Sequence, residues 1–311
     1  LYAGWFGIQI LKGWNLYSGS ERQLVLERRT YLLATIVSVA LVFQILSLFL
    51  FIYTADDLHI LFTGAMCAAG SLYVNSFGYL TLFLKAGNCL LAGIWLIFNH
   101  ADTKGYDYPL IRPKYILLLV VVVLVLTETV LQLNYFLNLK GDMITSCCGS
   151  LFGSDKPSVA SELANLPSHY MQPLFFASMA TTTLCGIWFS VKRSGVYLYS
   201  LLSASAFVIA MISVISFISL YFYELPTHHC PFCILQREYG YIGYLLYATL
   251  FTGATAGTGA GLLMPFSRHP SLTSFLPGYQ RLLVLLSASA YLLFTMVVAY
   301  RMLTTDFRLM G

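Results

Sequence analysis

Long apolar segments with almost no charge restrict what this sequence can fold into. The first such run covers residues 31–53, and a helix needs about 20 consecutive apolar residues to cross a bilayer. Only 10% of the 311 residues are charged and 58% are hydrophobic, whereas charged residues make up about 25% of a soluble domain. The sequence therefore predicts an all-α integral membrane protein surrounded by the lipid bilayer.

The apolar runs predict about seven membrane-spanning helices. Residues 58–98 are too many for one helix, and two full spans there would invert every later loop. We therefore interpret residues 58–71 as a re-entrant or interfacial segment. The predicted spans are residues 31–53, 72–98, 115–139, 170–191, 196–223, 233–264 and 282–303.

Positive charges fall in alternate loops, and this pattern predicts an orientation. Lys and Arg are enriched in cytoplasmic loops, and here they gather at one predicted end of the helices. They are Arg28, Arg29, Lys104, Arg112, Lys114, Lys192, Arg193, Arg268 and Arg281. The pattern predicts a cytoplasmic N-terminus in a multi-pass protein of a bacterial inner (cell) membrane. The net charge of +4 is small, and no basic cluster indicates nucleic-acid binding.

Two close cysteine pairs, Cys147–Cys148 and Cys230–Cys233, fall on the predicted outer, periplasmic side. Disulfides persist in the periplasm, and strained, exposed disulfides are the redox-active kind. The second pair is predicted to begin the long helix 233–264, where the helix dipole favours a thiolate. The other cysteines are single and lie in apolar segments, so we expect them to be packing residues. They are Cys67, Cys89 and Cys185.

Arg237 follows Cys233 by four residues, so the two side chains are expected to share one face of that helix. An arginine just inside the membrane is costly and suggests a functional role, with snorkelling to the headgroups, or pairing with Glu238 or Glu224, as the alternative. The motif Cys230-x-x-Cys233-Ile-x-x-Arg237 resembles the quinone-proximal motif of the bacterial disulfide bond protein B family. The helix order of residues 115–265 is similar to that of the vitamin K epoxide reductase family.

The resemblance implies a four-helix bundle around a quinone. In this scheme Cys233 faces the quinone and Cys230 exchanges with the cysteines of the outer loop. Arg237 would lie at the quinone carbonyl, and we assign Gln236 and Tyr241 to the same pocket. The adjacent loop cysteines, the additional helices and the two histidines before Cys230 depart from the family pattern.

This interpretation predicts how the chain is organised. Residues 1–29 form an amphipathic, Trp-rich cytoplasmic segment that lies in the interface or packs on a partner subunit. Residues 30–114 supply two spans and the outer re-entrant segment, 115–265 the redox bundle, and 266–311 a C-terminal span. The predicted function is a membrane thiol–disulfide oxidoreductase passing electrons between a periplasmic thiol protein and membrane quinone. Its predicted catalytic residues are Cys147, Cys148, Cys230 and Cys233.

The same residues also support a different prediction. His228, His229, Cys230 and Cys233 have the ligand types and spacing to hold copper or zinc. The chain would then be a metal-binding membrane protein. A further alternative is a membrane subunit of a larger redox complex in which the cysteines are structural.

Two ionisable residues are predicted near mid-membrane, Lys85 in the second span and Glu128 in the third. Either alone would be expensive in lipid, so we predict a structural ion pair that fixes helix register, with a proton path as the alternative. In the sixth span, Gly253, Gly257 and Gly261 repeat the spacing that allows close helix packing.

Overall fold

The structure, a computed structural model, describes residues 2–15, 20–141, 144–145 and 159–309. Within these residues the chain is helical, and β-structure is limited to one isolated bridge between Thr63 and Ile144. The long helices are α2 (Glu21–Asp57), α4 (Phe77–Asp102), α5 (Ile111–Leu137), α7 (Ser168–Lys192), α8 (Val196–Ser213), α10 (Ile242–Leu262) and α11 (Leu276–Thr304). The all-helical prediction is confirmed.

Shorter elements occupy the ends of the long helices. The short α-helices are α1 (Tyr2–Gly13), α3 (Ala68–Tyr73), α6 (Val159–Ala164) and α9 (Ser219–Tyr223). A π-helical turn, η2 (Val214–Ile218), joins α8 to α9. The 3-10 turns are η1 (Leu58–Leu61), η3 (Cys233–Leu235), η4 (Arg237–Tyr239) and η5 (Met264–Phe266).

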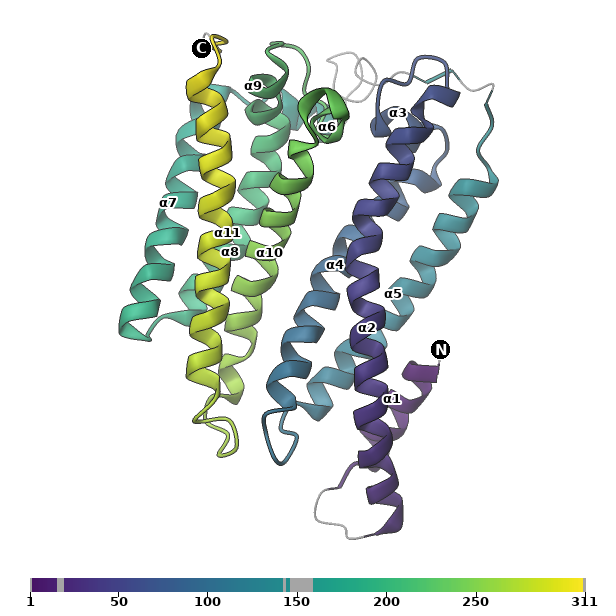
Figure 1. Cartoon of the computed structure of the whole chain (residues 1–311), viewed down its shortest axis with the longest axis vertical. Coiled ribbons are helices and arrows are strands. Elements are labelled where there is room, and N and C mark those ends of the chain that lie inside the picture. The colour runs from purple at the N-terminus through teal and green to yellow at the C-terminus, as the bar shows by residue number, and fades with distance from the viewer. Residues whose placement is uncertain (1, 16–19, 142–143, 146–158, 310–311) are drawn as a thin grey trace.

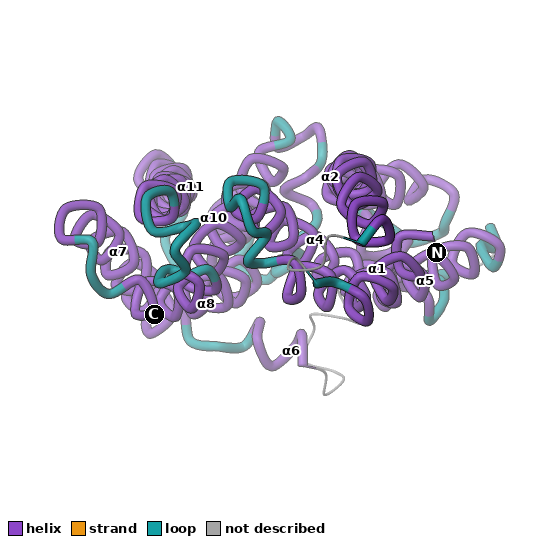
Figure 2. Tube along the Cα trace, turned by 90° about the horizontal axis from the view of Figure 1, so that it is seen from below, coloured by secondary structure: helices purple, strands orange, loops and turns teal. Residues whose placement is uncertain are grey.

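The long helices form two groups that lie side by side (Figures 1 and 2). In one group α10 packs against α8 and α11, and α7 packs against the same two helices, which closes a four-helix bundle. In the other group α4 packs between α2 and α5, and α1 lies against α5. Contacts between α4 and α10 join the groups.

This grouping differs from the predicted bundle of residues 115–265. The first helix of that range, α5, packs mainly with α4, whereas α11 from the predicted C-terminal part completes the bundle around α10. The reason lies in α10, whose small residues admit neighbours on several sides. A Cβ atom on Gly257 would lie 2.1 Å from Ser203 Oγ of α8, and one on Gly253 would lie 3.0 Å from the Tyr291 ring of α11.

Six stretches of the described chain are long and apolar enough to cross a membrane. They are Gln23–Leu61, Phe77–Asp102, Ile111–Leu137, Ser168–Lys192, Val196–Tyr223 and Leu276–Thr304. The protein is therefore a multi-pass membrane protein in contact with lipid. Helix α10 is not among them, because its Gly and Thr residues reduce its apolar character, although it runs alongside the others (Figure 1).

The connections alternate between the two ends of the helices (Figure 1). The connections α4–α5, α7–α8 and α10–α11 lie at the same end as the start of α2. Together with the adjoining helix ends they hold seven of the nine basic residues on which the predicted orientation rests. One residue of the predicted basic set has another role. Lys114 is 1% exposed and pairs with Asp102, whose other carboxylate oxygen accepts a hydrogen bond from Leu110 N (2.9 Å). It therefore fixes the α4–α5 turn and adds little free charge to that end.

The structure brings the two predicted mid-membrane charges together. Lys85 Nζ lies 2.7 Å from Glu128 Oε1, and both residues are 2% exposed. Glu128 Oε2 also accepts hydrogen bonds from Asn88 Nδ2 and Gln44 Nε2, each at 2.6 Å. Lys85 Nζ donates to Ser47 Oγ as well (3.1 Å). The pair thus links α4 and α5 to α2.

Candidate functional site

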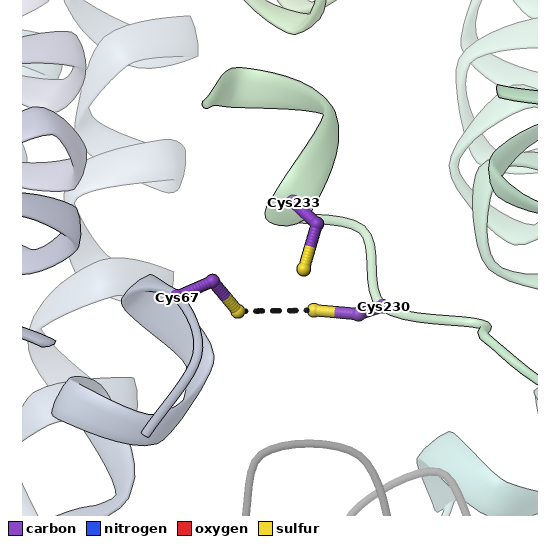
Figure 3. A group of neighbouring side chains, drawn as sticks. All are labelled: Cys67, Cys230 and Cys233. Carbon is purple, nitrogen blue, oxygen red and sulfur yellow. Dashed lines mark hydrogen bonds between the residues drawn. The ribbon is translucent and has the colours of Figure 1, made fainter. Parts of the chain in front are cut away.

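Three cysteines converge at the end of the molecule opposite the basic connections. The Sγ atoms of Cys67, Cys230 and Cys233 all lie within 4.8 Å of one another, and those of Cys67 and Cys230 are 3.4 Å apart. Figure 3 shows the three sulfur atoms pointing toward a common centre, one from the α2–α4 connection and two from the α9–α10 connection. All three side chains are buried, with exposures of 0%, 0% and 4%.

Hydrogen bonds of Gln236 to Asp56 and Met66, which we call the Asp56 bracket, hold the two connections together. Asp56 at the end of α2 accepts the Ala68 N–H (2.9 Å), which fixes the start of α3 directly after Cys67. The same Asp56 Oδ1 accepts Gln236 Nε2 (3.1 Å), and Gln236 Nε2 also donates to Met66 O (2.9 Å). Gln236 belongs to the segment that carries Cys230 and Cys233, so these bonds position the third cysteine against the pair.

Tyr223 shapes the segment that carries the cysteine pair. Its hydroxyl donates to Cys230 O and accepts the Ile234 N–H (2.9 Å), so it spans the turn between the two cysteines. Tyr247 of α10 donates to Pro231 O at 2.8 Å. The turn is therefore fixed from both sides by phenol groups, because the short connection cannot satisfy its own backbone.

The cysteine pair does not begin a long helix, contrary to the prediction. Cys233 opens the three-residue turn η3, and α10 starts only at Ile242. Gln236 is extended (φ −78°, ψ 162°), and Gly240 and Tyr241 both have positive φ, so the chain is redirected before α10 begins. The helix dipole of α10 consequently cannot act on these thiols.

The two histidines before the pair have different surroundings. His228 Nε2 lies 3.3 Å from Cys233 Sγ, and its ring meets that of Tyr223 edge-on with centroids 4.6 Å apart. His229 Nδ1 instead lies 2.9 Å from Ile215 O in the π-helical turn. A carbonyl only accepts, so this nitrogen of His229 is a donor. His228 therefore belongs to the sulfur cluster, and His229 anchors the connection to η2.

The predicted quinone ligands occupy other positions than expected. Arg237 is exposed and lies in η4, separated from η3 by the extended Gln236, so the prediction that it shares a helix face with Cys233 is wrong. Gln236 belongs to the Asp56 bracket described above. Tyr241 is 45% exposed at the start of α10. In the same η4 turn, burial raises the pKa of the Tyr239 phenol, and the neighbouring Cys233 adds to the rise.

Sequence reasoning missed Cys67, which we expected to be a packing residue. Its Sγ contacts that of Cys230 instead. The only sequence signal was topological, because the predicted re-entrant segment 58–71 placed it on the same side as the other pair. The predicted catalytic residues Cys147 and Cys148 lie outside the residues that the structure describes.

An apolar cavity of about 200 Å³ lies next to the cysteine turn. Pro231 and Phe232, the two residues between the cysteines, line one side together with Leu235 of η3, and α2, α4, the α8–η2 segment and α10 supply the rest. Among the described residues, its lining does not include Arg237, Gln236 or Tyr241. A wider apolar cavity of about 530 Å³ between α2, α4, α10 and α11 shares two lining residues with it, Phe49 and Phe251.

This arrangement permits two kinds of chemistry. Thiols in contact can exchange disulfides through thiolate attack, and three sulfurs with an imidazole nitrogen form a ligand set for a soft metal ion. Comparison with protein families, curated proteins and solved structures finds no match to this chain.

Proposed function

We propose that the protein is a membrane thiol–disulfide oxidoreductase that passes electrons between a thiol protein and membrane quinone. The observation that carries this proposal is the position of the Cys230–Cys233 turn. It touches a third thiol, Cys67, on one side, and on the other its own Pro231 and Phe232 line an apolar cavity.

The residues of the cluster suit thiol exchange. The Cys67 and Cys230 sulfurs already lie 3.4 Å apart, and disulfide exchange requires direct contact between sulfur atoms. The imidazole of His228, 3.3 Å from Cys233 Sγ, is placed to hold the thiol proton or to donate to the thiolate. Oxidation of Cys230 and Cys233 forms one S–S bond and releases two electrons and two protons.

The cavity fits a quinone ring by its position and its lining. Its walls are aliphatic and aromatic, and the edge of the turn that carries the thiols forms part of them. A bound quinone would supply the acceptor for the two electrons and two protons. The wider cavity that shares Phe49 and Phe251 offers an apolar path for an isoprenoid tail between the helix groups.

The proposed setting is a bacterial inner membrane. The connections α4–α5, α7–α8 and α10–α11, with the basic residues in and beside them, would face the cytoplasm, and α10 would be a seventh span within the closed bundle. The cysteine cluster would then lie at the periplasmic end, where disulfides persist. A periplasmic dithiol would deliver electrons through Cys147 and Cys148, as the sequence predicts, or directly to Cys67.

The test measures thiol-driven reduction of a short-chain quinone by the purified full chain in detergent. We expect the wild type to catalyse it and Cys233→Ser to lose at least about 100-fold in rate, since the dithiol is then gone. Cys185→Ser is the matched control, because Cys185 lies in α7 away from the cluster, and it should keep the wild-type rate. Equal rates for the wild type and Cys233→Ser would rule the proposal out.

A second variant separates the quinone site from the thiols. Ala86 lines the cavity, so Ala86→Phe should fill it and raise the KM for quinone, while alkylation of the cysteines stays unchanged. Its neighbour Gly87 has open space around it, so Gly87→Ala should leave the KM as it is. An unchanged KM in Ala86→Phe would remove the cavity from the proposal.

A further inference from the structure

The sulfur cluster contains more ligands than a dithiol needs. Beyond the Cys230–Cys233 pair it holds the sulfur of Cys67, which contacts Cys230, and the Nε2 atom of His228, which contacts Cys233. We propose that the reduced cluster binds a zinc ion through Cys67, Cys230, Cys233 and His228. This ligand set contains one residue, Cys67, that no motif in the sequence indicates.

The distances between the three sulfurs are close to those of a four-coordinate zinc site. With Zn–S bonds of about 2.3 Å, the sulfurs of a tetrahedral site lie about 3.8 Å apart, and a sulfur and an imidazole nitrogen lie about 3.6 Å apart. The cluster has sulfur separations between 3.4 Å and 4.8 Å and an Nε2–Sγ distance of 3.3 Å. Shifts of about 1 Å would bring the three sulfurs to the tetrahedral spacing. The His228 ring, which contacts Cys233 Sγ but lies outside the mutual 4.8 Å of the three sulfurs, would turn toward the other two to complete the site.

Charge and burial favour zinc over a monovalent soft ion. Three thiolates with a divalent ion leave one net negative charge, whereas the same thiolates with Cu⁺ would leave two. The three sulfurs belong to side chains that are at most 4% exposed, and the cost of burying charge rises steeply with its amount. A closed site with three sulfurs and one nitrogen is also an arrangement typical of structural zinc.

The surrounding residues already fix the ligands in place. The ring of Tyr223 packs edge-on against His228, and its hydroxyl spans the turn between Cys230 and Cys233. Such outer contacts orient ligands and strengthen metal binding. His229 is anchored to Ile215 O, so it is not part of the ligand set, although the sequence predicts His228 and His229 equally as metal ligands.

This inference does not rest on the proposed oxidoreductase activity, because it requires only that the three thiols be reduced. The two functions are mutually exclusive at any one moment. A zinc ion on the thiolates blocks their oxidation, and a disulfide removes two of its ligands. Zinc would thus hold the site in its reduced form.

The experiment titrates the reduced full chain in detergent with Zn²⁺ against a chromophoric chelator, and with Co²⁺ as a spectroscopic probe. We expect about one ion per chain and strong thiolate-to-cobalt charge transfer. Loss of an outer contact alone weakens metal binding about 10–100-fold, so Cys67→Ser and His228→Ala should each lower the affinity at least tenfold. Wild-type affinity in Cys67→Ser, or a cobalt spectrum without thiolate bands, would overturn the proposal.

Matched variants distinguish ligand loss from general damage. Cys89→Ser and Cys185→Ser should keep wild-type affinity, and His229→Ala should lose less affinity than His228→Ala. His228→Cys should retain the ion and gain charge-transfer intensity from an additional sulfur. A loss in His229→Ala equal to that in His228→Ala would contradict the ligand set. A readout that needs no variant is alkylation of the wild type. Zinc should slow labelling of Cys67, Cys230 and Cys233 but not of Cys185, and equal labelling with and without zinc would refute the site.

Discussion

Cys67 Sγ lies 3.4 Å from Cys230 Sγ, although 163 positions separate the two residues in the sequence. The contact joins the α2–α4 connection of one helix group to the α9–α10 connection of the other. The junction between the two groups therefore carries the only cluster of thiols found in the described part of the chain.

The first prediction is that mild oxidation links Cys67 to Cys230. A disulfide has an S–S bond of about 2.05 Å, so the two sulfurs need to approach by only about 1.4 Å. In a Cys233→Ser variant, which removes the competing partner, we expect mass spectrometry of the digested protein to find the Cys67–Cys230 linked peptide. Cys89 and Cys185 serve as internal controls and should not link to Cys230. If peptides that link Cys230 to Cys89 or Cys185 were as abundant as the Cys67–Cys230 peptide, the contact between Cys67 and Cys230 would not be preferred.

The second prediction concerns the bracket that positions Cys67. Gln236 Nε2 donates to Asp56 Oδ1 and Met66 O, and a hydrogen bond to a charged group contributes about 1.5–3 kcal/mol. Gln236→Leu should therefore lower the rate of Cys67–Cys230 linkage about tenfold, without changing the alkylation of Cys185.

A glutamine elsewhere provides the control for this effect. Gln172 of α7 donates instead to Tyr221 OH of α9, at 3.3 Å. Gln172→Leu should leave the linkage rate unchanged. If both variants slow the linkage equally, the bracket has no specific role in positioning Cys67.

The sequence predicts the helices well because the signal for a membrane helix is local. A run of apolar residues specifies a span wherever it occurs, and the depth of Lys85 and Glu128 in their spans was enough to expect their pairing. Their further partners, Gln44 and Ser47 of α2, were not predictable, because the rotation of α2 about its axis depends on packing with the other helices.

The candidate site was only half predictable for the same reason. The Cys230–Cys233 motif is local, whereas the position of Cys67 depends on the long-range contact between Asp56 and Gln236. Because residues 233–264 are largely apolar, the sequence predicts one continuous helix there and misses the break before α10. The one sequence signal of this break is Gly240, which adopts a positive φ of 64°. Glycine tolerates this conformation without steric cost, so it marks the turn.

The third prediction concerns the buried ion pair. Glu128→Leu leaves the Lys85 cation with Ser47 as its remaining polar partner and removes the acceptor of Asn88 and Gln44, so it should cost about 3–5 kcal/mol in stability. Lys85→Met should cost less, because Glu128 keeps the Asn88 and Gln44 donors. The double variant should be more stable than the sum of the two losses implies.

Unfolding of the purified variants in detergent measures these differences. Lys104→Met is the control for loss of a positive charge, because Lys104 is exposed in the α4–α5 connection, and it should change stability by less than about 0.5 kcal/mol. Strictly additive losses at Lys85 and Glu128 would mean that the two residues do not form a coupled pair.

The fourth prediction tests the close packing of α10. A Cβ atom on Gly257 would lie 2.1 Å from Ser203 Oγ and 2.7 Å from Ser287 Oγ, so Gly257→Ala should destabilise the bundle by about 1–3 kcal/mol through overpacking. Gly87→Ala makes the same chemical change in α4, where nothing lies within 4 Å of the added atom. It should stabilise the protein by about 0.5–1 kcal/mol, the helix preference of Ala over Gly.

Thermal unfolding in detergent distinguishes these two effects. Because the clash of Gly257→Ala is with the Ser203 side chain, adding Ser203→Gly should recover part of the lost stability, whereas adding it to Gly87→Ala should not. Equal Tm values for Gly257→Ala and Gly87→Ala would mean that α10 has room for larger residues at this position. The bundle of α7, α8, α10 and α11 would then not depend on close approach between α8 and α10.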